Sequence, residues 1–271
     1  MSYWDLRSTA EHPALERGEP PPGLLSESEL LVLADLRVPK RRRDWILGRY
    51  TAKALVRAWL ARTGRDVPAT MLTVVAGLDG APGVFLAGQG PLPITISLSH
   101  SGPFALCALV PAPLAYLGAD VEKCEPRPAG FLADFFTPAE AALVAALPRA
   151  ERDRAVTEMW SVKEAALKAV RLGLRADTRE VVVRPRAWRG ASWGRAEMRI
   201  DLPGAAGGAA FVRDEGGYVA SIAWLGGNSP APSGELRGHP VLPALPKPEE
   251  PRPEPTRPEE AMPAITLGGA A

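Results

Sequence analysis

Two acidic residues, Asp120 and Glu122, follow the apolar run Leu114 to Leu117. The run predicts the end of a buried strand, where successive side chains alternate between faces, so both carboxylates share one face and Val121 points to the other. Two interpretations are open. The acids are solvated at a strand end near the surface, or they repel each other unless a cation bridges them.

A second candidate pair, Glu164 and Lys168, lies about forty residues later in a segment without Gly or Pro. The segment is rich in Ala, Leu, Lys and Glu, which predicts a helix with these two side chains one turn apart. They form a surface ion pair worth about 0.2–0.5 kcal/mol, or they bring a third carboxylate and a cation to the acidic strand. The neighbouring Lys163 is interpreted as a surface charge and Trp160 as a core aromatic.

A histidine, His100, stands at the end of the alternating run Ile94 to Ser99, in Ser99-His100-Ser101-Gly102. A serine nucleophile paired with His100 is rejected, because adjacent residues rarely reach the required geometry and no acid partner is implied. A phosphate-binding turn made of hydroxyl, imidazole and backbone N–H groups remains open. A purely structural histidine remains open as well.

A basic cluster, residues 40–43, opens a predicted helix that also carries Arg49. Arg41 and Arg49 are eight positions apart, which is about two helical turns, so both can address one ligand if the helix begins early enough. Guanidinium groups suit phosphates. A solvated helix face is the alternative, and nucleic acid is a weaker one because the chain is nearly neutral and carries no nucleic-acid-binding motif.

Composition limits the other functions of this chain of 271 residues, whose net charge is +1. Cys107 and Cys124 are too few for a disulfide framework or a thiolate zinc site. Three histidines, far apart in sequence, argue against a histidine-rich metal site, so a metal would have oxygen ligands such as those of Mg²⁺. No signal peptide or long apolar span is evident, so we expect a cytoplasmic protein without membrane or nucleic-acid partners.

The predicted elements divide into two similar sets. Proline makes residues 1–25 irregular. Capping residues and apolar periodicity predict helices at 26–37, 42–63, 130–136, 138–147 and 150–170. Apolar and alternating runs predict strands at 71–76, 84–86, 94–99, 104–110, 114–121, 180–184, 196–202, 209–213 and 218–224. This outline permits a duplicated α/β unit, and the proline-rich end of the chain predicts a flexible tail.

The motifs resemble the large, single-chain (Sfp-type) class of the 4'-phosphopantetheinyl transferase superfamily. The resemblance rests on Gly118-Ala119-Asp120-Val121-Glu122, Trp160-Ser161-Val162-Lys163-Glu164 with Lys168, and Ser97-Leu98-Ser99-His100-Ser101. Phe135-Phe136-Thr137-Pro138-Ala139-Glu140 and Gly48-Arg49 fit as well. It covers residues 28–225. By resemblance we expect an α+β fold with a pseudo-two-fold duplication: an N-terminal subdomain at 1–112, a C-terminal subdomain at 113–226 and a disordered, proline-rich tail at 227–271.

The resemblance also implies a chemistry: the phosphopantetheine arm of coenzyme A moves to a serine of an apo acyl or peptidyl carrier protein, and adenosine 3',5'-bisphosphate is released. Asp120, Glu122 and Glu164 would hold Mg²⁺ on the pyrophosphate. Glu164 would act as the base and Lys168 would neutralise charge, so that Glu164, Lys168 and Asp120 form the catalytic set. The adenosine 3'-phosphate end of coenzyme A would be bound by Arg41, Arg49, Ser99 and His100. Such enzymes serve polyketide and nonribosomal peptide synthesis, and we expect a monomer.

Two departures from the family pattern stand out. Gly80-Ala81-Pro82 replaces the frequent Gly-Lys-Pro, so one phosphate contact is missing or comes from elsewhere. Ala119 replaces Ile or Val, which we expect to loosen packing on the far face of the strand. The first departure motivates an alternative: a non-catalytic module of the same fold that binds coenzyme A or a carrier protein.

Overall fold

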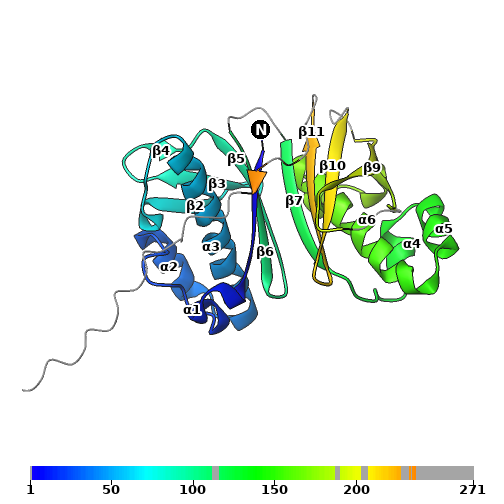
Figure 1. The fold of residues 1–271 in the computed structure, drawn as a ribbon, viewed down its shortest axis with the longest axis horizontal. Coiled ribbons are helices and arrows are strands. Elements are labelled where there is room, and N and C mark those ends of the chain that lie inside the picture. Colours follow the sequence, from blue (N-terminus) through cyan, green and yellow to red (C-terminus); the bar gives the residue numbers. More distant parts are fainter. Residues whose placement is uncertain are drawn as a thin grey trace, which may run out of the picture.

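Two similar halves lie side by side, each with helices outside and a sheet inside (Figure 1). The computed structural model describes residues 2–111, 116–186, 190–202, 207–226, 232 and 234–235. The predicted α+β class is confirmed. In each half one long helix covers the outer face of the sheet, and the inner faces of the two sheets meet. The layers therefore run helix, sheet, sheet, helix.

The first half contains most of the elements that the sequence predicts, with small shifts in their bounds. Its helices are α1 (Pro13–Glu16), α2 (Glu27–Asp35) and α3 (Pro39–Arg62), with short 3₁₀ turns at Thr9–Glu11 and Ala69–Met71. Its strands are β1 (Tyr3–Ser8), β2 (Leu72–Ala76), β3 (Pro82–Leu86), β4 (Gly90–Pro91), β5 (Ile94–Ser101) and β6 (Phe104–Pro111). The basic cluster therefore lies inside the first turn of α3, as the eight-residue spacing of its arginines requires.

The second half repeats this order. Its helices are α4 (Phe131–Phe135), α5 (Pro138–Ala146) and α6 (Arg149–Ala169), with 3₁₀ turns at Gly173–Arg175 and Thr178–Glu180. Its strands are β7 (Tyr116–Lys123), β8 (Val181–Arg184), β9 (Gly194–Ile200), β10 (Gly208–Glu215) and β11 (Tyr218–Leu225). Each half thus begins with a strand, continues through short helices to one long helix, and ends in antiparallel hairpins.

Strand pairing follows the same pattern in both halves. With β12 (Gly234–Glu235), the sheet orders are β12-β1-β6-β5, β7-β11-β10-β9-β8 and β2-β3-β4. The first strand of each half pairs antiparallel with its last long strand, β1 with β6 and β7 with β11. When hairpin β5–β6 is superposed on hairpin β10–β11 by their turns, Cys107 matches Ser221. The residues that pair with them on the neighbouring strands, Asp5 and Asp120, then match as well. The halves therefore share the order and register of their three central strands, which describes an internal duplication. They differ at the sheet edge, because β2, β3 and β4 form a separate sheet, whereas β9 and β8 continue the sheet of the second half.

A buried lysine–glutamate pair anchors the long helix in each half. Lys53 of α3 contacts Glu29 and donates to two backbone carbonyls, and Val74 N–H donates to the same glutamate. In α6, Lys163 lies 3.0 Å from Glu140 and donates to the carbonyl of Thr178 at 3.0 Å, and the N–H of Val183 donates to that glutamate at 2.8 Å. The interpretation of Lys163 as a surface charge is wrong, because its partners satisfy the ammonium inside the core.

The interface between the sheets is apolar. Its core consists of residues from β1, β6, β7, β10 and β11: Trp4, Leu6, Leu106, Ala108, Val110, Leu117, Ala119, Val121, Ala209, Phe211, Ala220, Ile222 and Trp224. Ala119 and Val121 face this core, so Asp120 and Glu122 alternate to the other side of β7.

One other prediction needs correction. Residues 1–25 are not irregular, because Tyr3–Ser8 form a strand inside the first sheet, whose buried Asp5 accepts a hydrogen bond from Arg7 at 2.6 Å. In the predicted tail, Gly234–Glu235 form β12, which pairs parallel with β1. The rest of that tail, except residue 232, lies outside the described residues.

Candidate functional site

A close approach of α6 to β7 sets the position of the acidic side chains. A Cβ on Gly118 would lie 1.7 Å from the carbonyl oxygen of Ala165, so only glycine allows the helix backbone to lie against the strand here. Asp120, two residues later, faces the same helix. The acidic strand motif and the helix motif thus meet because of the glycine that begins the first of them.

Asp120 is the centre of the resulting group. The residue is 2% exposed, and its Oδ1 accepts from Lys168 Nζ at 2.7 Å and from Ser99 Oγ at 2.8 Å. Lys168 also donates to Ser99 Oγ at 3.1 Å and to the Ala119 carbonyl at 3.2 Å. Strands β5 and β7 are joined here as well, since Ala119 N–H donates to Ser97 Oγ at 2.9 Å. Residues from both halves therefore converge on one carboxylate.

The two other predicted acids are part of the same electrostatic group. Burial raises the pKa of Glu164, and the charges of Asp120 and Glu122 raise it further, against the opposing effect of Lys168. Burial and then Asp120 raise the pKa of Glu122, although Arg127 donates to its Oε2 at 2.9 Å. Ionising all three acids together is costly without a further cation.

The donor set has the chemistry of a site for a hard divalent cation. All three candidate ligands are carboxylates, which Mg²⁺ prefers. In the described part of the chain, Asp120 Oδ2 is buried without a hydrogen-bond partner. Within the same residues no three acidic, imidazole or thiol side chains converge closely enough to hold a metal ion. The acids therefore match Mg²⁺ in type and charge but not in spacing, and cationic side chains pair with two of them: Lys168 donates to Asp120, and Arg127 donates to Glu122.

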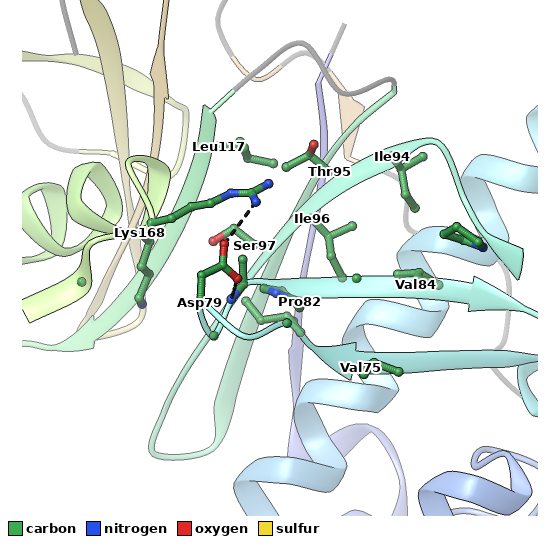
Figure 2. Close-up of a pocket in the computed structure, with 18 of the residues that line it drawn as sticks. Val75, Asp79, Pro82, Val84, Ile94, Thr95, Ile96, Ser97, Leu117 and Lys168 are labelled. Atoms are coloured by element: carbon green, nitrogen blue, oxygen red, sulfur yellow. Dashed lines mark hydrogen bonds and ion pairs between the residues drawn. The ribbon is translucent and has the colours of Figure 1, made fainter. Parts of the chain in front are cut away.

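Two adjoining cavities lie near this group; Lys168 lines the first of them, and none of the three acids lines either. The larger, of about 790 Å³, lies between β3 and β5 on one side and the end of α6 on the other (Figure 2). Lys168 reaches it from α6, and apolar side chains that include Ile96 and Leu117 form much of its wall. At its edge Arg171 Nη1 lies 3.1 Å from Asp79 Oδ2, which joins the two halves.

The second cavity, of about 530 Å³, gathers the predicted phosphate ligands. Arg41, Arg49 and His100 line it together, and it shares Gly80, Pro82 and Leu98 with the first cavity. The Arg49 guanidinium lies 3.8 Å from the centre of the Trp45 ring, and burial lowers its pKa to about 10. Its Nε is buried and unpaired within the described residues. An anion here would therefore find a partly desolvated donor.

The structure separates two neighbours that the sequence grouped together. Ser99 lies with Asp120 and Lys168, whereas His100, on the opposite face of β5, lies with the arginines of the second cavity. Asp44, Arg127 and the Asp79–Arg171 pair were not predicted from the sequence. Asp44 is one helical turn from Lys40, a spacing that could have revealed it. The Asp79–Arg171 contact spans both halves and leaves no local signal.

Residues 116–221 match the family described as the 4'-phosphopantetheinyl transferase superfamily. The matched segment covers less than half of the chain. It runs from β7 into β11, so it contains Asp120, Glu122, Glu164 and Lys168. The second cavity's Arg41, Arg49 and His100 lie outside it.

Two solved structures are similar to part of the chain. One is a holo-(acyl-carrier-protein) synthase from Bacillus anthracis in complex with CoA (3',5'-ADP), 21% identical, covering 41% of this chain and 93% of that one, with a TM-score of 0.33. The other, from Thermotoga maritima, is a holo-[acyl-carrier-protein] synthase, 20% identical, covering 49% and 73%, with a TM-score of 0.33. No curated protein matches the chain. No helix among the described residues is long and apolar enough to cross a membrane.

Proposed function

We propose that the protein is a Mg²⁺-dependent 4'-phosphopantetheinyl transferase that modifies a serine of apo acyl or peptidyl carrier proteins. The observation that carries the proposal is the convergence of Lys168 and Ser99 on Asp120, beside two further acids with raised pKa values. A superfamily match over the segment that contains these acids supports it. The site lies where the two halves meet, and we propose residues 1–112 and 113–226 as the two subdomains.

Coenzyme A would bind across both cavities. The second cavity offers Arg41, Arg49 and His100 to the 3'-phosphate end of the nucleotide. Asp120, Glu122 and Glu164 would hold Mg²⁺ once their side chains move closer together than they lie here. The ion supplies positive charge to the pyrophosphate oxygens when it is bound. Lys168 extends from α6 toward the same place, where its ammonium would neutralise charge that builds up on the transferring phosphoryl group.

The reaction would transfer the phosphopantetheinyl group from coenzyme A to a serine of the carrier protein. The serine oxygen of the carrier protein attacks the β-phosphorus of coenzyme A, and a new P–O bond forms as the bond to adenosine 3',5'-bisphosphate breaks. Glu164 accepts the serine proton, directly or through water. Burial and neighbouring acids raise the pKa of this carboxyl group, which makes its ionised form a stronger base.

The test is a mass-spectrometric assay with an apo carrier protein, coenzyme A and Mg²⁺. The carrier should gain the mass of phosphopantetheine with the wild-type protein. Asp120→Ala and Glu164→Ala should lower the rate by ~10²-fold or more. Glu197→Ala, which removes an exposed acid on β9, is the control and should transfer normally. Normal transfer by both active-site variants would refute the mechanism.

The same assay separates the enzyme from a non-catalytic module. Calorimetry measures coenzyme A binding independently of transfer. Binding without any mass gain, over a panel of acyl and peptidyl carriers, would favour the module.

A further inference from the structure

An acidic residue, Asp44, lies inside the cavity that is otherwise suited to an anion. It is the one acid among the described residues that line the second cavity, which also contains Lys40, Arg41 and Arg49. A carboxylate in such a place repels a phosphate. Its contacts therefore need an explanation other than direct binding of the ligand.

The contacts of Asp44 join α3 to the end of β5. Its Oδ2 accepts from Lys40 Nζ at 2.8 Å and lies 3.7 Å from His100 Nδ1. The Asp44 side chain is 14% exposed, whereas that of His100 is 49% exposed. With Nδ1 directed at the carboxylate, Nε2 is the ring nitrogen that remains for a ligand.

We propose that Asp44 is a positioning residue for phosphate binding, which orients His100 and favours its protonated, anion-binding form. The inference rests on the proposed function, since it takes the 3'-phosphate of a coenzyme A nucleotide as the ligand of this cavity. Asp44 itself touches no phosphate. It acts through the imidazole.

The charges around His100 agree with a role for Asp44 in favouring the protonated imidazole. Burial lowers the pKa of His100, and Lys40 from α3 and Lys168 from α6 lower it further, whereas Asp44 raises it. Arg41 and Arg49 line the same cavity. The free imidazole is therefore largely neutral at neutral pH, and a bound phosphate, together with Asp44, would shift it toward the imidazolium form.

Phosphate binding and protonation of His100 should favour each other. A pKa that is higher in the complex than in the free protein means that binding takes up a proton. Affinity for the phosphate is then gained below the pKa of His100 in the complex and is lost as the pH rises through it. Without Asp44 the loss begins at lower pH.

The test follows the imidazole itself by NMR. Histidine-labelled protein is titrated with pH, free and saturated with adenosine 3',5'-bisphosphate, and His100→Gln assigns the signal. The titration midpoint of wild-type His100 should rise on binding. Asp44→Asn should lower the midpoint in the complex by about one pH unit. Lys40→Met should raise it, and Asp44→Glu should restore most of the wild-type value.

Matched controls separate this role from a structural one. Asp201→Asn removes an exposed acid that pairs with Arg199 at 2.7 Å, and it should leave the midpoint unchanged. Equal thermal unfolding temperatures for the wild type and Asp44→Asn would show that the shift does not come from unfolding. An unchanged midpoint in the Asp44→Asn complex overturns the inference. Absence of any bisphosphate binding by the wild type instead overturns the nucleotide site of the proposed function.

Discussion

Single side chains at the site are held by cations and hydrogen-bond donors from different elements. Asp120 on β7 receives Lys168 from α6 and Ser99 from β5, and Arg127, beyond the end of β7, holds Glu122. Removing one partner therefore leaves a partly buried charge on another element uncompensated. This mutual dependence makes the acids responsive to both cations and protons.

Mg²⁺ should stabilise the folded protein more at pH 8 than at pH 5. The raised pKa values of Glu122 and Glu164 mean that the folded state keeps protons which the unfolded state has already released, so without metal the unfolding free energy falls as pH rises through that interval. Mg²⁺ binds the ionised form and opposes this loss. Thermal unfolding with and without Mg²⁺ at both pH values measures the effect. An equal increase in the Asp120→Asn variant would contradict it.

The placement of functional side chains relative to one another was predictable where they lie a few residues apart in the sequence. Alternation along β7 placed Asp120 and Glu122 on one face, and helical spacing paired Glu164 with Lys168 one turn apart. The partners from distant segments were not predictable. Lys163 was misread because its buried partner, Glu140, lies twenty-three positions away, and nothing in the local sequence distinguishes a buried lysine from a solvated one.

Elements meet at the site because one backbone contact permits it. Gly118 allows α6 to lie against β7, and the motif of alternating acids depends on that contact. Helix bounds were predictable because capping boxes mark them: Ser26 with Glu29, and Thr137 with Glu140. Strand β1 was missed because the irregularity inferred from the prolines, which begin at Pro13, was extended to the residues before them.

Gly118→Ala should destabilise the fold by about 3 kcal/mol, because the new methyl group overlaps the Ala165 carbonyl and forces α6 away from β7. Urea unfolding measures the change. Gly48→Ala is the matched control, since a Cβ there meets nothing within 4 Å. Equal stability of Gly118→Ala and the wild type would show that the contact is not as close as described.

Lys163→Met should lower the unfolding free energy by about 3–5 kcal/mol, because it leaves Glu140 charged in the core. Lys53→Met should behave alike, since Glu29 holds the corresponding place in the other half. The double variant Glu140→Gln/Lys163→Met should lose less than the two single variants together. Strict additivity in urea unfolding would show that the pair is not coupled.

At the scale of the whole molecule, an exposed ion pair between Asp79 and Arg171 joins the two halves at the edge of the larger cavity. Arg171→Ala should leave the unfolding free energy nearly unchanged, because the pair is largely solvated. It should nevertheless speed hydrogen exchange in residues 77–81, since that turn loses its contact with the other half. Arg199→Ala, which breaks an ion pair within one half, should leave this segment unchanged. Exchange mass spectrometry measures both.

Strand pairing has a further consequence for how the chain could be divided. Each half pairs its own first and last long strands, so a cut between Pro111 and Tyr116 would leave both fragments with their principal strands paired. Each fragment alone would expose an apolar sheet face, with Trp4 and Leu6 on one and Val121 and Ile222 on the other. Expressed separately, the fragments should aggregate; produced together, they should reassemble by fragment complementation. Recovered activity would then report the meeting of any two proteins fused to them.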